Sequence, residues 1–178
     1  MFSVTNGFKF LGCLSALLFC VVPAAASERH LDAHEHGVSS LKIAQDGDRI
    51  QFELEAPGND IVGFEHAAES DAERKAVDGA LETLQAPDKL FSVVQDARCK
   101  LLEAEAEFET EGDHAGFHVS WTLECRNVAA TTSLNFGYFG AFERAREVEV
   151  EAFGNAGQSA YEVERDTTTL DLTGVISN

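Results

Sequence analysis

The sequence predicts a β-rich α+β domain, with an antiparallel sheet or sandwich and one main α-helix. Short segments that alternate apolar and polar side chains recur along the chain, and turn residues separate them about every ten positions. Only the segment 70–86 has a long run of apolar residues at helical spacing. No repeat or linker divides the chain, so we expect a single domain over residues 38–178.

Residues 1–26 have the pattern of a secretory signal peptide. Lys9 precedes the apolar run FLGCLSALLFCVVP, and the small residues AAAS follow, so we expect cleavage after Ala26. The histidine-containing segment 27–37 would then lead into the domain. Loss of Lys9 changes the formal charge from −18 to −19, which disfavours nucleic acid or anionic lipid as a partner. The run is too short for a confident membrane span, so we expect no membrane insertion after cleavage.

A hairpin is predicted over residues 38–56. The segments SLKIAQ and RIQFELEA alternate, and Asp46-Gly47-Asp48 between them has turn composition. Pro57-Gly58-Asn59-Asp60 ends the second arm. The residues of that arm expected to face the core are Ile50, Phe52, Leu54 and Ala56.

The segment 70–86 is predicted to be a helix. Ser70 and Glu73 have the spacing of a capping box, and Pro87 marks the end. Its apolar stripe consists of Ala72, Ala76, Val77, Ala80, Leu81 and Leu84. The helix carries no histidine, so we expect it to have a packing role.

Two strands are predicted on either side of Gly112. The segment LLEAEAEFE places Leu102, Ala104, Ala106 and Phe108 on one face and Glu103, Glu105, Glu107 and Glu109 on the other. The segment FHVSWTLEC directs Phe117, Val119, Trp121, Leu123 and Cys125 inward. The glutamate row fits either a cation-binding surface or the solvated face of a sheet.

The last third of the chain is predicted to complete the sheet. Residues 133–146 are aromatic-rich and should form a short strand and one helical turn. Val148, Val150 and Ala152 mark a further strand, and residues 154–157 form a turn. SAYEVE and TTLDLTGV then close the sheet.

Cys99 and Cys125 are the cysteines that remain after signal removal. In an exported chain we expect them to form a disulfide that contributes on the order of 3 kcal/mol. A pair of zinc thiolates is the alternative interpretation.

Three of the six histidines stand in the stretch HLDAHEHG, residues 30–37. His34 and His36 are two residues apart, so in an extended chain both rings leave the same face about 6.6 Å apart and can converge on one ion. His30 lies close to the expected start of the exported chain, where it is either a further ligand or a spectator.

The remaining histidines are isolated in the sequence. His66 precedes the predicted helix, where it either packs locally or folds back against the H-x-H pair. On one straight strand His114 and His118 would lie about 13 Å apart, too far for one ion. Catalytic motifs such as G-x-S-x-G, a P-loop or H-E-x-x-H do not occur, so metal binding is favoured over a structural role.

Several stretches of the chain resemble the ZrgA-like family of zinc-regulated periplasmic proteins, a domain of unknown function. They are HEHGVSSLKIAQDGDRIQFELEAPGNDIVGFEHAAESDAERKAV, the Cys99 segment, FHVSWTLEC and GQSAYEV with LDLTG. The resemblance implies a periplasmic zinc-binding protein that acts in zinc acquisition or homeostasis beside a zinc importer. It matches His34 and His36 to the family's H-x-HG, His66 to its FEHA, and either His114 or His118 to the histidine before the Cys125 strand.

The chain departs from this resemblance in one respect. Similar proteins often carry a long histidine-and-aspartate tract between the two cysteine strands, and only ETEGDHAG stands there. A structured site is therefore expected rather than high-capacity zinc storage.

We therefore expect a non-enzymatic zinc-binding module, with Zn²⁺ and components of a periplasmic zinc uptake system as partners. The expected ligands are His34, His36 and His66, with His114 or His118 as the fourth and Glu65 or Asp32 as substitutes. A zinc-dependent hydrolase and an exported adhesin-like β-domain with incidental histidines are the alternatives.

Overall fold

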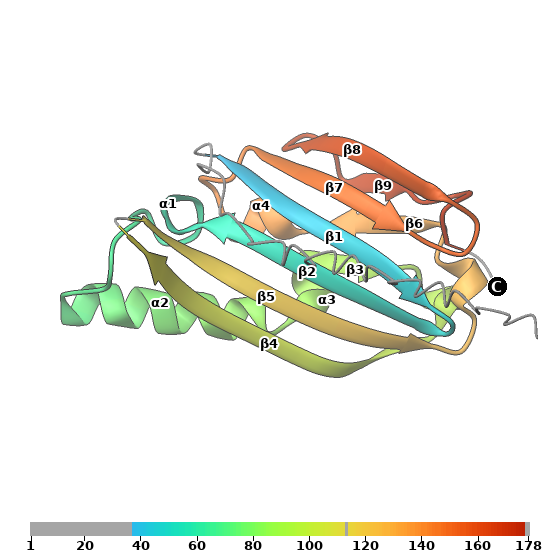
Figure 1. Cartoon of the computed structure of the whole chain (residues 1–178), viewed down its shortest axis with the longest axis horizontal. Helices are drawn as coiled ribbons and strands as arrows, with labels where there is room; N and C mark the ends of the chain where they lie inside the picture. The colour runs from blue at the N-terminus through green and yellow to red at the C-terminus, as the bar shows by residue number, and fades with distance from the viewer. Residues whose placement is uncertain (1–36, 113, 177–178) are drawn as a thin grey trace, which may run out of the picture. The chain divides into compact units, whose positions relative to one another are not determined.

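Two β-sheets make up most of the computed structural model, which describes residues 37–112 and 114–176 (Figure 1). The larger sheet has the strand order β4-β5-β2-β1-β7-β8, and the smaller has the order β3-β6-β9. The strands are β1 (Val38–Asp46), β2 (Arg49–Pro57), β3 (Phe91–Val93), β4 (Cys99–Glu111), β5 (His114–Cys125), β6 (Ser133–Phe136), β7 (Glu147–Phe153), β8 (Gln158–Glu164) and β9 (Thr169–Asp171). The α-helices are α1 (Gly58–Ile61), α2 (Asp71–Leu84), α3 (Pro87–Leu90) and α4 (Tyr138–Ala141). The predicted β-rich α+β class, with one main helix in a single domain, is confirmed.

The predicted hairpin is formed by β1 and β2. These strands pair antiparallel from Ser40–Glu55 to Asp46–Arg49, and Gly47 turns the chain at φ +61°. Such a positive φ favours glycine. All four side chains expected to face the core from the second arm are buried: Ile50, Phe52, Leu54 and Ala56.

The larger sheet is mixed, because one strand pair departs from the antiparallel expectation. β1 pairs with β7 in parallel, from Val38–Glu147 to Ala44–Phe153. Parallel neighbours need a long connection, and here the whole segment from β2 to α4 provides it. The expectation that TTLDLTGV closes the same sheet is wrong, since β9 pairs with β6 in the smaller sheet.

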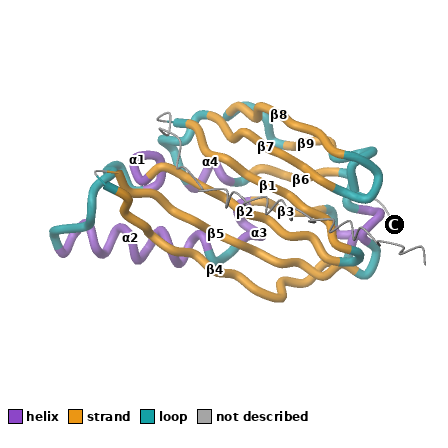
Figure 2. The backbone as a smooth tube through the Cα atoms, viewed as in Figure 1, coloured by secondary structure: helices purple, strands orange, loops and turns teal. Residues whose placement is uncertain are grey.

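One face of the larger sheet is covered by the smaller sheet and the helices, and the core lies between them. Phe91 of β3 joins the two sheets, with ring centroids 5.8 Å from Trp121 of β5 and 5.3 Å from Phe136 of β6. Figure 2 shows α2 running along β4 and β5. The Trp121 indole N–H donates to the carbonyl of Leu84 at 2.8 Å, which ties the end of α2 to β5.

Helix α2 begins with the predicted capping box. The Glu73 N–H donates to the Ser70 hydroxyl, and the Ser70 N–H donates to the Glu73 carboxylate. The Glu73 carboxylate also accepts the Glu69 N–H, and these two backbone hydrogen bonds, from Ser70 and Glu69, lower the pKa of Glu73. Of the predicted apolar stripe, Val77, Ala80 and Leu84 are buried and Leu81 packs partly against the core, but Ala72 and Ala76 are exposed. The first turns of α2 project beyond the ends of β4 and β5 in Figure 1, so no strand covers them.

The other face of the larger sheet is solvated and rich in carboxylates. Burial alternates along β2 as far as Ala56 and along the whole of β7, with Leu54 and Val150 inward and Glu53 and Glu149 outward. The glutamates on this open face are Glu53, Glu55, Glu103, Glu105, Glu107, Glu109, Glu111, Glu124, Glu147, Glu149, Glu151, Glu162 and Glu164. Along β4 the alternation is broken by a bulge between Leu101 and Glu103, which leaves Leu102 exposed against expectation.

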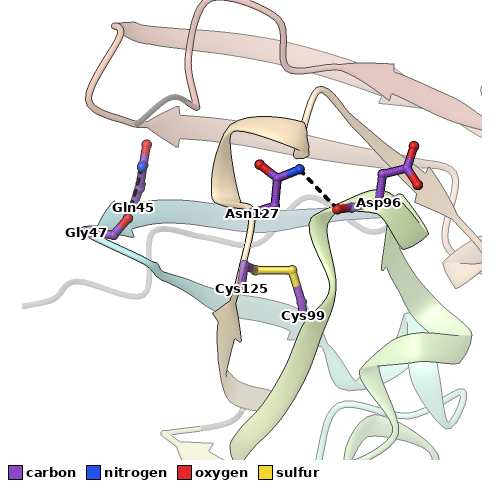
Figure 3. The surroundings of a disulfide bond; sticks show 6 residues. All are labelled: Gln45, Gly47, Asp96, Cys99, Cys125 and Asn127. Carbon is purple, nitrogen blue, oxygen red and sulfur yellow. Dashed lines mark hydrogen bonds between the residues drawn. A yellow bond between two sulfur atoms is a disulfide. The ribbon is translucent and has the colours of Figure 1, made fainter.

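The predicted disulfide joins Cys99, at the start of β4, to Cys125, at the end of β5 (Figure 3). These residues are cross-strand partners in the β4–β5 pair. Beside them the Asn127 amide donates to the carbonyl of Asp96 at 3.2 Å. Because the two sulfurs are bonded to each other, the alternative of two zinc thiolates does not apply to this structure.

No helix within residues 37–112 and 114–176 is long and apolar enough to cross a membrane. The predicted signal peptide, residues 1–26, lies outside the described residues.

Candidate metal-binding site

Three of the described candidate residues, Glu65, His66 and His114, fall at the end of the larger sheet where β1, β5 and β7 begin. We call this the N-proximal end; it comprises Gly37, α1, the loop 62–70 and His114, at the left in Figure 1. A Cβ placed on Gly58 of α1 would lie 2.5 Å from the Phe64 carbonyl oxygen and 2.7 Å from that of Ala115. The loop and the start of β5 therefore both pack directly against α1.

His30, His34 and His36 lie outside the described residues, as does Asp32. The chain is described from Gly37, the residue that follows the H-x-H pair. The Gly37 N–H donates to both carboxylate oxygens of Asp60 at 2.9 and 3.0 Å, and Asp60 itself is buried in α1. The point where the histidine segment joins the domain is therefore fixed at the N-proximal end.

His66 lies in the loop 62–70 with its ring largely exposed. The ring stacks on Phe64 with centroids 5.0 Å apart, and Nδ1 lies 2.9 Å from the carbonyl oxygen of Ala67. A carbonyl oxygen only accepts hydrogen bonds, so Nδ1 carries the proton and a neutral ring keeps its lone pair on Nε2. Nε2 is 4.0 Å from a carboxylate oxygen of Glu73, whose other oxygen serves the capping box. His66 thus presents the nitrogen that a metal ion would need.

His114 and Glu65 form a pair between β5 and the loop. Nδ1 of His114 lies 3.6 Å from a Glu65 carboxylate oxygen. The His114 side chain is 75% exposed and the Glu65 side chain only 17% exposed. Glu65 immediately precedes His66 in the sequence, so the loop brings a shielded carboxylate and an imidazole to the same region as His114. Such mixed nitrogen and oxygen donors are typical of zinc sites.

His118 has different surroundings, on the open face of the sheet as its alternation predicts. Its Nδ1 lies 4.0 Å from Glu55 of β2, and its Nε2 lies 3.7 Å from Glu109 of β4. It is four strand residues from His114, about 13 Å along the backbone. The two histidines therefore have separate sets of carboxylate neighbours, and only His114 has Glu65 as a neighbour.

No complete ligand set is found among residues 37–112 and 114–176. No three His, Cys, Asp or Glu side chains of these ranges gather as a group able to hold a metal ion. What the described residues provide is two exposed imidazoles and a shielded carboxylate at the sheet end where Gly37 lies.

Sequence reasoning did not identify Asp60, which we had placed only within a turn. The structure makes it a buried carboxylate that binds the backbone next to the histidine segment. A single acidic residue in a Pro-Gly-Asn-Asp sequence has the composition of any exposed turn, so its burial left no signal in the sequence.

Fold and site together define a β-rich domain with imidazole and carboxylate groups at one end of its main sheet. Residues 33–172 match the model of a protein family described as ZrgA family zinc uptake protein. The chain therefore belongs to the ZrgA family, as the resemblance implied, and this membership associates it with zinc acquisition. The family is one of uptake proteins rather than enzymes. No curated protein matches the sequence.

Proposed function

We propose that this protein is an exported, periplasmic zinc-binding protein that acts in zinc acquisition, with Zn²⁺ as its cargo. One observation carries the proposal: Gly37, which directly follows the H-x-H pair, is bound by Asp60 at the sheet end that also holds His66, His114 and Glu65. Family membership supports zinc as the metal. Components of a zinc uptake system are the partners that such a role implies.

The proposed ligands come from both sides of Gly37. His34 and His36 would supply two imidazoles and His66 a third, through Nε2. For the fourth position we favour His114 over His118, because His114 lies beside Glu65 whereas His118 lies between Glu55 and Glu109. Glu65 or Asp32 would substitute for one imidazole, and His30 remains a further candidate. Four nitrogen or oxygen donors are what tetrahedral zinc requires.

The acidic open face supports this function in a different way. Its glutamates give the chain a strongly negative field, which raises the local concentration of divalent cations. Carboxylates alone favour Ca²⁺ and Mg²⁺, whereas imidazole favours zinc. In the proposal the histidines therefore provide selectivity, and the acidic face only attracts cations.

The test is zinc titration into the purified protein by isothermal calorimetry at pH 7.5 and at pH 5.5. Protonated imidazole cannot bind a metal, so the affinity should fall as the pH drops through about 6.5. Zinc binding at pH 7.5 should be weakened by the double substitution His34→Ala/His36→Ala and also by His114→Ala, because each removes a proposed ligand. The matched control His118→Ala removes a histidine outside the proposed site, so it should change zinc affinity by less than about twofold.

Equal affinity at the two pH values would refute a histidine site. If His118→Ala loses zinc binding and His114→Ala does not, the fourth ligand is His118 and not His114. The alternative of incidental histidines predicts no rise in melting temperature at saturating zinc, whereas specific binding to the folded state raises it.

A further inference from the structure

A shallow hollow lies on the open face of the larger sheet, where β1, β7 and β8 run side by side (Figure 1). We call it the β7–β8 hollow; its volume is about 490 Å³, and its lining includes Ser40, Glu149, Glu151, Ala160 and Glu162. Ser40 lies beside Glu149 in the register of β1 and β7, and Ala160 lies opposite Glu151 in that of β7 and β8. Short side chains therefore alternate with long carboxylate side chains, and the hollow is acidic.

Two carboxylates of the hollow face each other across neighbouring strands. Glu149 of β7 is the cross-strand partner of Glu162 of β8, and both side chains are exposed. Like charges directly opposite each other on one face of a sheet repel and destabilise the pair. Lys42 of β1 lies beside Glu151 in the register, but among the described residues neither Glu149 nor Glu162 forms an ion pair with a basic side chain. A cationic group placed between these two carboxylates would relieve their repulsion.

An exposed aromatic ring stands on the same face of β7. Phe153, the last residue of this strand, is 43% exposed, and Glu149 and Glu151 point to the same side of the strand. A single exposed apolar side chain needs no explanation by itself. A ring with carboxylates two and four residues away, however, matches one particular side chain, because an arginine guanidinium both stacks on an aromatic face and pairs with carboxylates. Aromatic residues also carry much of the binding energy at protein–protein contacts.

We propose that the β7–β8 hollow docks a basic surface of a partner protein, with an arginine of that partner against Phe153, Glu149 and Glu162. The inference goes beyond the proposed function and does not depend on which residues bind zinc. Charge complementarity identifies the occupant: acidic and basic surfaces attract each other, whereas like charges brought together at an interface oppose binding. A second copy of this chain has the same acidic face and a formal net charge of −18, so two such faces would repel each other.

The first test titrates the purified protein with two short synthetic peptides, one alternating arginine with serine and the other lysine with serine. Glu149→Gln/Glu162→Gln should weaken binding of the arginine peptide by about fivefold, the effect of losing two exposed ion pairs. The matched control Glu105→Gln/Glu107→Gln removes the same charge from β4 on the same face, and should change the affinity by less than about twofold. The natural protein should bind the arginine peptide more tightly than the lysine peptide, and Phe153→Ser should remove that preference.

The second test uses the full chain in living cells of its source organism. A photoreactive benzoylphenylalanine takes the place of Gln158, the cross-strand partner of Phe153. Irradiation should produce an adduct with a basic protein, identified by mass spectrometry. The adduct should disappear in Glu149→Gln/Glu162→Gln and persist in Glu105→Gln/Glu107→Gln. Because Glu149→Gln/Glu162→Gln removes a repulsive pair, its melting temperature should not fall, so loss of the adduct reports on docking and not on folding.

Several results would overturn the proposal. Equal weakening of peptide binding by the two double variants would attribute the binding to the general negative field of the chain. Equal affinity of the natural protein for the two peptides would remove the arginine contact with Phe153. An adduct of twice the mass of the chain would make a second copy the occupant, and an adduct with an acidic protein would contradict charge complementarity. The absence of any adduct would refute a docked partner.

Discussion

Replacing both cysteines by serine should lower the stability of the domain without affecting zinc binding. The disulfide links residues 26 positions apart, and closing a loop of that length removes chain entropy from the unfolded state worth about 3.5 kcal/mol. For a domain of this size the unfolding entropy is about 0.3 kcal/mol per kelvin, so Cys99→Ser/Cys125→Ser should reduce the melting temperature by about 12 °C.

Scanning calorimetry of the natural protein and the double variant measures this difference, and zinc titration of both measures the effect on the site. The disulfide joins the start of β4 to the end of β5, whereas His114 stands at the other end of β5. Zinc affinity should therefore stay within about twofold, as for independent sites. A drop in melting temperature below about 4 °C would refute the loop-entropy argument. A large loss of zinc affinity would refute the separation of the site from the sulfur atoms.

Three further substitutions test single contacts by thermal or denaturant unfolding. Ser70→Ala removes the helix cap of α2 and should cost about 1 kcal/mol; an unchanged stability would contradict the capping box. The lowered pKa of Glu73 means that the capping contribution of its carboxylate is present above about pH 4.5 and is lost as the pH falls through the lowered pKa. Trp121→Phe leaves the Leu84 carbonyl without its indole donor and should destabilise the protein by about 1–3 kcal/mol. Nearly unchanged stability would show that a water molecule replaces the donor. Gly37→Ala places a side chain at φ +95°, a backbone conformation that L-residues rarely adopt, and should lower both stability and zinc affinity; natural values of both would show that the start of β1 adapts.

The sequence predicted well the elements whose determinants are local. Strict alternation identified β2 and β5, and the Ser70–Glu73 spacing placed the start of α2. Alternation tells which face of a strand is buried but not which strand lies beside it. For that reason the sequence did not predict that β1 pairs in parallel with β7, or that β9 belongs to the smaller sheet.

Departures within the predicted elements also have non-local causes. The bulge after Leu101 turns Leu102 outward although the sequence pattern continues unbroken. Ala72 and Ala76 have helical spacing, but the helix extends past the sheet, so they find nothing to pack on. At the candidate site, local spacing led us to predict which residues could bind zinc, and that ligand set stays a prediction. Two contacts there depend on loop packing, which no local sequence pattern encodes. They are the approach of His114 to Glu65 and the hydrogen bond from the Gly37 amide to Asp60.

The pairing of β1 with β7 has a consequence for how the chain matures. Both N–H groups that the Gly37 carbonyl accepts come from residues 146 and 147, more than a hundred positions further on. A nascent or truncated product that ends before β7 would leave one side of β1 with unsatisfied hydrogen-bonding groups, a template for self-association. Formation of the proposed zinc site is thereby linked to completion of synthesis, and fragments that end before β7 are expected to bind zinc less tightly than the intact protein.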